Sequence, residues 1–325
     1  PHNLAYVGGD DKARFQAKLN FLALVFCLTL GTAALPHVLI RYYTTPSVSQ
    51  ARRSVFWSLL FIMLLYMTAP AYAAFAKLEI YSKLVNVEIS HLPAWVLAWS
   101  KIGLVSIEDI NRDGLLQLAE LTLNPDVIVL ATPEIAGMPY VISGLVAAGA
   151  LAAALSTAEG LLLTITSALS HDCYYRIFHP QASTQWRLVI SKSLLLLAAV
   201  FAAMVAAQKP ATILLMVAWA FSIAASAFFP ALVLGIFWKR ANKQGAVAGM
   251  LCGLGVCLFY IIGLEAQPLF WLPLGGQLDP WFGIESSSAG VWGVPVGFLV
   301  IVLVSLVTPP PPLETQAFVE SVRYQ

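Results

Sequence analysis

Residues 212–238 read TILLMVAWAFSIAASAFFPALVLGIFW, a stretch without a single Asp, Glu, Lys or Arg. A helix of about 20 apolar residues is long enough to cross the hydrocarbon core of a bilayer. This stretch therefore predicts a transmembrane helix. Six more stretches are comparably long and apolar, so we expect the chain to cross a membrane seven times, at residues 19–40, 55–76, 138–169, 188–207, 212–238, 245–264 and 291–308.

The overall composition excludes a soluble domain. Of the 325 residues, 59% are hydrophobic and 11% are charged, with a mean hydropathy of +0.79, whereas soluble domains carry about 25% charged residues. The 18 Lys and Arg nearly balance the 17 Asp and Glu, so no basic face is expected for nucleic acid. No P-loop or nucleophile elbow is found, and the four cysteines lack the spacing of a metal or disulfide site. We therefore expect a membrane protein that is not an enzyme.

The charges outside the spans predict the orientation of the chain. One side carries ten basic and three acidic residues, and the other carries eight basic and thirteen acidic residues. Short basic loops stay in the cytoplasm, so residues 1–18, 77–137 and 265–290 are expected outside. Residues 309–325 are expected to form a disordered cytoplasmic tail. Because the chain opens on Pro1, without a start Met or signal peptide, it resembles the C-terminal part of a longer membrane protein.

The span at 138–169 carries small and hydroxylated residues on one helical face. Close helix packing is one interpretation, because small residues let two backbones approach. The other is a cation site, because hard cations prefer oxygen ligands. The residues on this face are Ala153, Ser156, Thr157, Gly160, Thr164 and Ser167.

Glu159 lies in the same span. A carboxylate in the middle of a transmembrane helix costs about 2.5–3.5 kcal/mol on insertion scales, so such residues usually face a protein interior or a cavity. We interpret Glu159 as an accessory carboxylate. It is either protonated, paired with another helix or open to outside water.

The span at 19–40 contains GTAALPH at residues 31–37. Pro36 cannot donate to the helical ladder and disfavours the helical conformation at Leu35, so the helix should break there. Broken helices bind solutes in secondary transporters, which makes Gly31, Thr32 and Pro36 candidate substrate-binding residues. An ordinary proline kink explains the same residues.

Residues 109–120 read DINRDGLLQLAE and fit the calcium-loop pattern D-x-[DN]-x-[DN]-G-x5-E at every specified position. Calcium would take side-chain oxygens of Asp109, Asn111 and Asp113, the carbonyl of Leu115 and both oxygens of Glu120. The flanks, residues 102–108 and 116–123, are expected to be short helices, and residues 80–107 an amphipathic surface segment. A solvated Asx-turn is the alternative.

Several motifs resemble the sodium:solute symporter family, in its cation/acetate branch. They are GTAALPH at 31–37 with RYYT at 41–44, AALST at 153–157, SHD at 170–172, and the signature that runs from Gly235 through Arg240 and Gly245 to Gly249. The resemblance covers all seven spans. It implies an all-α integral membrane protein with a LeuT-like inverted-repeat fold, here the second repeat (core helices 6–10) plus two peripheral helices.

By the same resemblance, sodium binds the Ala153 carbonyl and the hydroxyls of Ser156 and Thr157. The remaining ligands come from core helix 1, which this chain lacks, so the chain alone should not transport. The expected function is sodium-coupled symport of a small organic solute, such as acetate or another short monocarboxylate, across the plasma (bacterial inner) membrane. The expected partners are the solute, sodium and the lipid bilayer. A proton-coupled carrier that uses Glu159 and a transporter-like nutrient sensor are the alternatives.

Overall fold

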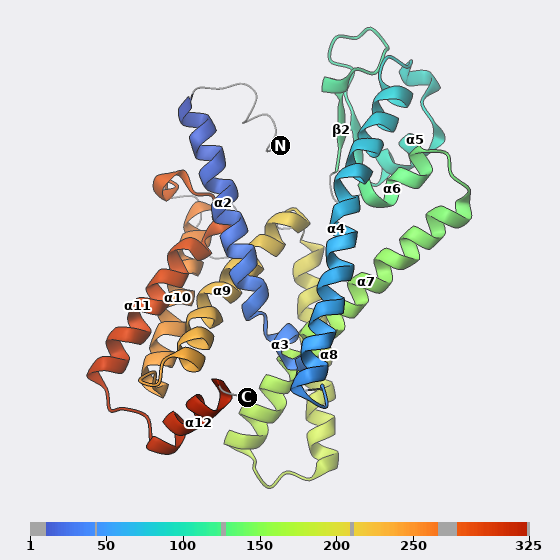
Figure 1. Cartoon of the computed structure of the whole chain (residues 1–325). Helices are drawn as coiled ribbons and strands as arrows, with labels where there is room; N and C mark the ends of the chain where they lie inside the picture. Colours follow the sequence, from blue (N-terminus) through green and yellow to red (C-terminus); the bar gives the residue numbers. More distant parts are fainter. Residues whose placement is uncertain (1–10, 43, 125–127, 209–210, 266–277, 324–325) are drawn as a thin grey trace. The chain divides into compact units, whose positions relative to one another are not determined.

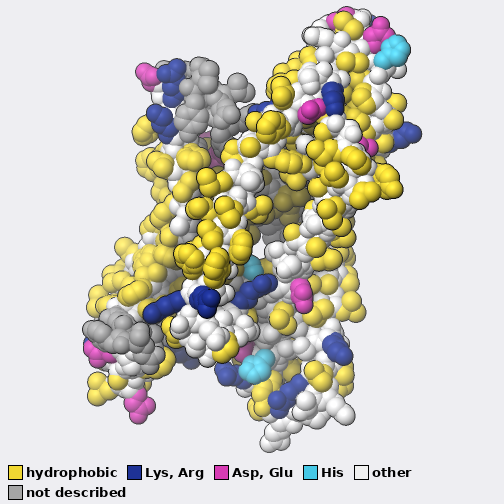
Figure 2. All heavy atoms as spheres, turned by 45° about the vertical axis from the view of Figure 1, so that its right-hand side comes forward, with side chains coloured by type: hydrophobic (Ala, Val, Ile, Leu, Met, Phe, Trp, Pro, Cys, Tyr) yellow, Lys and Arg dark blue, Asp and Glu magenta, His cyan; other side chains and the backbone are white. Residues whose placement is uncertain are grey.

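A computed structural model of the chain describes residues 11–42, 44–124, 128–208, 211–265 and 278–323. Within these described residues, seven helices are long and apolar enough to cross a membrane, which confirms the number predicted from the sequence. Figure 2 shows hydrophobic side chains over much of the visible surface, as lipid contact requires. Of the expected outer segments 1–18 and 265–290, residues 1–10 and 266–277 lie outside the described residues.

The chain divides into two compact units, residues 1–41 with 164–325 and residues 42–163. Unit 1 contains α2 (Asp11–Ala34), α3 (Pro36–Tyr42), α8 (Thr184–Ala207), α9 (Ile213–Phe237), α10 (Lys243–Leu264), α11 (Gly290–Val307) and α12 (Leu313–Arg323). Unit 2 contains α4 (Val48–Leu84), α5 (Ala94–Lys101), β1 (Val105–Ile107), β2 (Leu121–Leu123), α6 (Ile128–Ile135) and most of α7 (Tyr140–Ser167). Short 3-10 turns lie at Ile89–His91, Leu118–Glu120, Trp281–Gly283 and Ser286–Ser288.

Helices α2, α9, α10 and α11 pack side by side in unit 1 (Figure 1). Glycines bring α10 very close to its neighbours. A Cβ atom on Gly253 would lie 2.5 Å from the Ser226 carbonyl oxygen of α9 and 3.0 Å from that of Gly293 in α11. Small residues allow such packing between membrane helices, where apolar burial drives association only weakly.

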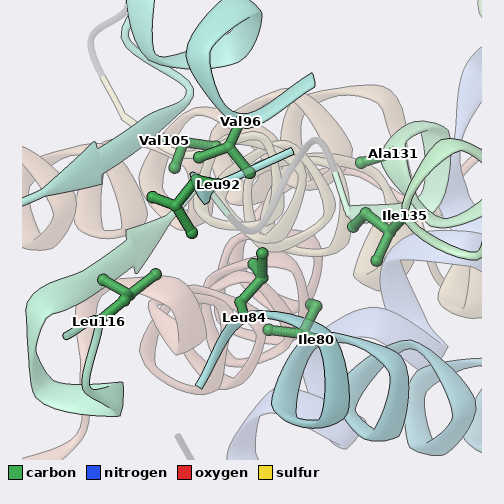
Figure 3. Packing of buried hydrophobic residues seen from close by; sticks show 8 residues of the cluster. All are labelled: Ile80, Leu84, Leu92, Val96, Val105, Leu116, Ala131 and Ile135. Carbon is green, nitrogen blue, oxygen red and sulfur yellow. The ribbon is translucent and has the colours of Figure 1, made fainter. Parts of the chain in front are cut away.

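The segment between α4 and α7, residues 85–135, folds around its own hydrophobic cluster (Figure 3). Residues from α4, α5, β1 and α6 converge there, and Trp95 and Trp99 pack against them. The expectation that residues 80–107 form a surface segment is therefore wrong, because their apolar side chains have a core to enter. The buried members are Ile80, Leu84, Leu92, Val96, Val105, Leu116, Ala131 and Ile135.

Two further expectations about local structure are wrong. The flanks of the 109–120 loop carry the antiparallel strands β1 and β2, with Val105 opposite Leu123 and Ile107 opposite Leu121, and only a 3-10 turn at Leu118–Glu120 instead of two helices. The tail after the proline run is helical as α12, instead of disordered. An ion pair between Lys239 and Glu320 and a hydrogen bond from Gln316 Nε2 to the Pro311 carbonyl, 2.9 Å long, hold it in place.

Candidate functional site

The predicted cation ligands lie on an open face of α7. The Thr157 hydroxyl donates a hydrogen bond to the Ala153 carbonyl over 3.2 Å, and Ala153, Ser156 and Thr157 are all exposed. The hydroxyl and the carbonyl that the sequence predicts as ligands are therefore in direct contact. At about 100° per residue, Ser156 lies roughly 60° from Ala153 and roughly 100° from Thr157 around the helix.

Glu159 is also exposed on α7 and lies beside Ser156, away from Thr157. At about 100° per residue, it is roughly 60° from Ser156 and roughly 160° from Thr157. Its carboxylate therefore flanks the hydroxyl face and does not extend it.

The first span is interrupted where Pro36 predicts a break. Helix α2 ends at Ala34 and α3 begins at Pro36, and the Leu35 carbonyl accepts the N–H groups of Val38 and Leu39 at 3.1 Å. One turn is thus rebuilt immediately after the proline.

The candidate solute-binding residues near this break differ in the contacts that they already make within the chain. Gly31 is buried, and a Cβ atom there would lie 2.5 Å from the Phe221 carbonyl oxygen, so its role is close packing against α9. The Thr32 hydroxyl donates to the Leu28 carbonyl at 2.7 Å, which leaves its oxygen free only as an acceptor. Beside Pro36, the Nδ1 atom of His37 is buried and has no hydrogen-bond partner among the described residues.

Some polar features of the spans did not enter the sequence prediction. In α9, Ser222 Oγ donates to the Ser287 carbonyl at 2.9 Å and Ser226 Oγ donates to the Ser222 carbonyl at 2.8 Å. The four-residue spacing of these serines was the available signal, because it places both on one helical face.

The chain continues from α7 into a π-helix, Ala168–Phe178. Such a segment is rare and is often found at functional sites. The Arg187 guanidinium stacks over the Tyr175 ring at 3.5 Å, and Trp186 Nε1 donates to the Tyr174 hydroxyl at 2.9 Å. The sequence analysis did not predict this change from α-helix to π-helix.

The 109–120 loop of unit 2 is folded through its polar side chains. Asp109 Oδ2 accepts the Gly114 N–H at 3.1 Å, Asn111 Oδ1 accepts the Asp113 N–H at 3.1 Å, and Asp113 Oδ1 accepts the Leu115 N–H at 2.8 Å. The hydrogen bond from Leu115 lowers the pKa of Asp113, with further donors from Asn111 and Gln117. The loop therefore holds Asp113 as a carboxylate.

Glu120 closes the loop from its far end. Its side chain is buried, with Oε1 accepting the N–H groups of Ile110 at 3.0 Å and Asn111 at 3.4 Å. Oε2 accepts the Gln117 N–H at 2.9 Å. Within the described ranges, no group of three or more His, Cys, Asp or Glu side chains is assembled as a ready metal site.

One family model and several curated proteins match this chain. Residues 103–253 match the model of the sodium:solute symporter family. An uncharacterized symporter of Cupriavidus necator is 53% identical over 306 residues, which are 94% of this chain and 44% of that protein.

Two more distant relatives are also carriers by name. An uncharacterized symporter of Bacillus subtilis is 29% identical, over 88% of this chain and 49% of that protein. The monocarboxylic acid transporter of Corynebacterium glutamicum is 29% identical, over 80% of this chain and 42% of that protein. The chain thus spans less than half the length of the relatives it matches.

Proposed function

Because this chain belongs to the sodium:solute symporter family, we propose that it forms part of a carrier that couples sodium entry to the uptake of a small organic solute. The helical membrane fold expected from the sequence is confirmed by the seven spans, with the short strands β1 and β2 as an addition, and the family gives it a LeuT-like architecture. We assign core helix 1 of that architecture to the part of the relatives that this chain does not cover.

The contact between Thr157 Oγ1 and the Ala153 carbonyl carries the proposal for sodium. In this proposal the two oxygen atoms, which lie 3.2 Å apart on one helix, supply part of a hard-cation site, and the Ser156 hydroxyl supplies a third oxygen. The exposure of this face leaves room for ligands from another helix. In this proposal sodium is cargo, and its gradient drives the cycle.

The proposed solute is a short monocarboxylate such as acetate. The name of the Corynebacterium glutamicum relative supports this class. The interrupted helix at Leu35 is the candidate binding region, because unwound backbone in transporters lines the solute site. Thr32 and Pro36 border the interruption, and Gly31 brings this part of α2 against α9.

We also propose that the short basic loops and the chain's C-terminal residue face the cytoplasm of a plasma (bacterial inner) membrane. Residues 77–137 then lie outside. The excess of basic residues on one side supports this orientation.

The test is uptake of labelled acetate by the complete natural protein in proteoliposomes, with and without an inward sodium gradient. The variants are Ser156→Ala with Thr157→Val, and Thr166→Val as the matched control. Thr166 lies nine residues beyond Thr157, roughly 180° around α7. The control substitution therefore deletes a hydroxyl from the face of α7 opposite to Thr157.

Sodium-dependent uptake that falls at least tenfold in the double variant and persists in Thr166→Val would support both the ion and the site. Uptake that keeps its sodium dependence in the double variant would show that sodium binds to other residues. A protein that transports no acetate under any gradient would refute the proposed solute and leave the family assignment intact.

Proton coupling is the second candidate, because Glu159 is an exposed carboxylate on the same helix. It predicts sodium-independent uptake driven by a pH gradient, lost in Glu159→Gln. Sodium-dependent uptake that Glu159→Gln leaves unchanged would exclude this mechanism.

A further inference from the structure

The 109–120 loop has the backbone that a calcium loop requires. Arg112 and Gly114 both have left-handed φ angles, 59° and 73°, which turn the chain sharply around the side chains at its first, third and fifth positions. Each of those three side chains accepts one backbone N–H of the loop. The oxygens of Asp109, Asn111 and Asp113 are therefore gathered on one turn.

One oxygen in this turn has no partner. Asp109 Oδ1 is buried and accepts no hydrogen bond from the described residues. A buried carboxylate oxygen without a donor is costly, and a bound cation would satisfy it. Asp109 lines a pocket of about 450 Å³, together with Asp113, Leu115 and a further acidic residue, Glu88.

The loop is also anchored as calcium loops are when they occur in pairs. The Leu116 N–H donates to the Val87 carbonyl and the Asn86 N–H donates to the Leu116 carbonyl, both at 2.9 Å. Leu116 itself is fully buried in the hydrophobic cluster of the 85–135 segment. The 86–89 backbone therefore takes the place of a second loop, and the core fixes the position of the ligands.

We propose that residues 109–120 bind one calcium ion through the side chains of Asp109, Asn111, Asp113 and Glu120 and the carbonyl of Leu115. This donor set consists only of oxygen, which is the chemistry of a Ca²⁺ site. Glu120 already points into the loop, so binding exchanges its contacts with the N–H groups of Ile110, Asn111 and Gln117 for coordination. The inference stands apart from the proposed transport function.

The test is equilibrium binding of radioactive Ca²⁺ to the complete natural protein in detergent, after chelator treatment, with Mg²⁺ as competitor. We expect one ion per chain, half-saturating at about 10⁻⁴–10⁻³ M, the range of extracellular modules. Asp109→Asn and Asp113→Asn should each weaken binding at least tenfold. The matched control is Glu108→Gln, which removes the same charge one residue before the loop and should leave binding within twofold.

A second measurement does not depend on the variants. Arg112 is exposed in the loop and is a trypsin site. Ca²⁺ at about 1 mM, but not Mg²⁺, should slow cleavage there at least fivefold, with no change at Lys101. Absence of saturable Ca²⁺ binding to the wild-type protein, equal loss in Asp109→Asn and Glu108→Gln, or unchanged cleavage at Arg112 would each overturn the proposal.

Discussion

Gly253 shows how one missing side chain decides a helix contact. Its Cα lies where α9, α10 and α11 meet, and the atoms that an added Cβ would strike are the backbone carbonyls of Ser226 and Gly293. Backbone cannot rotate out of the way as a side chain can. The close packing of three helices therefore depends on this position remaining glycine.

We predict that Gly253→Ala destabilises the protein by about 1–3 kcal/mol, the usual cost of overpacking a tight interior. The measurement is unfolding in mild detergent by heat or by titration with denaturing detergent. Gly255→Ala is the matched control, because its Cβ meets nothing within 4 Å, and it should be neutral or stabilising by up to about 1 kcal/mol. Equal losses in both variants would show that α10 tolerates no side chain for some reason other than packing.

The start of α10 depends on Asn242, which joins two helices. Its Oδ1 accepts the Gly245 N–H at 2.8 Å as the N-cap. Its Nδ2 donates to Thr308 Oγ1 at 2.6 Å and to the Pro309 carbonyl at 2.9 Å, just after α11 ends. The side chain thus caps one helix and ties down the end of the next.

Asn242→Ala should lower the stability of the protein by about 1–2 kcal/mol, because it removes the cap and the link to α11. Asn242→Ser keeps a capping oxygen but cannot span to Pro309, so it should lose less than the alanine variant. Thermal unfolding of both variants in detergent measures the difference. Identical melting temperatures for the two would mean that the cap contributes nothing and that the link to α11 accounts for the loss.

Elements with a strong local signal could be predicted, and those held by distant contacts could not. The strands β1 and β2 carried a readable signal, since Val105-Ser106-Ile107 and Leu121-Thr122-Leu123 alternate apolar and polar residues. The expectation of helices came from the usual flanks of a calcium loop. Helix α12 had no such signal, because Lys239, the partner of its Glu320, lies 81 residues earlier in the chain.

Across the whole molecule, the seven spans were predictable because the length and apolar composition that let a helix cross a bilayer can be read from each stretch of sequence alone. The packing of α2 against α9 depends on Gly31 and Phe221, residues far apart in the chain, and nothing local predicts it. Likewise, the sequence named Gly31 as a candidate ligand, but its burial against α9 is visible only in three dimensions. The Thr157–Ala153 contact, four residues apart, was predictable from helical spacing alone.

The proposed orientation of the molecule can be tested with its own cysteines. Cys173 is exposed in the π-helix after α7, whereas Cys27 and Cys257 are buried. A membrane-impermeant maleimide should therefore label inside-out vesicles and spare right-side-out ones, with labelling lost in Cys173→Ala. Cys252 is exposed within α10, where the bilayer excludes the reagent. Labelling of Cys173 in right-side-out vesicles would reverse the orientation.

Helix α4 has 37 residues, about 55 Å at 1.5 Å per residue, whereas the hydrocarbon core of a bilayer is about 30 Å thick. Its last turns place Ile80 and Leu84 in the hydrophobic cluster of the 85–135 segment. This segment is therefore packed against the end of a helix that continues into the membrane. For electron microscopy of a small membrane protein, this is a useful epitope. A nanobody raised against the 85–135 segment would be held rigidly to a transmembrane helix, and it could align particle images that the detergent micelle alone leaves without features.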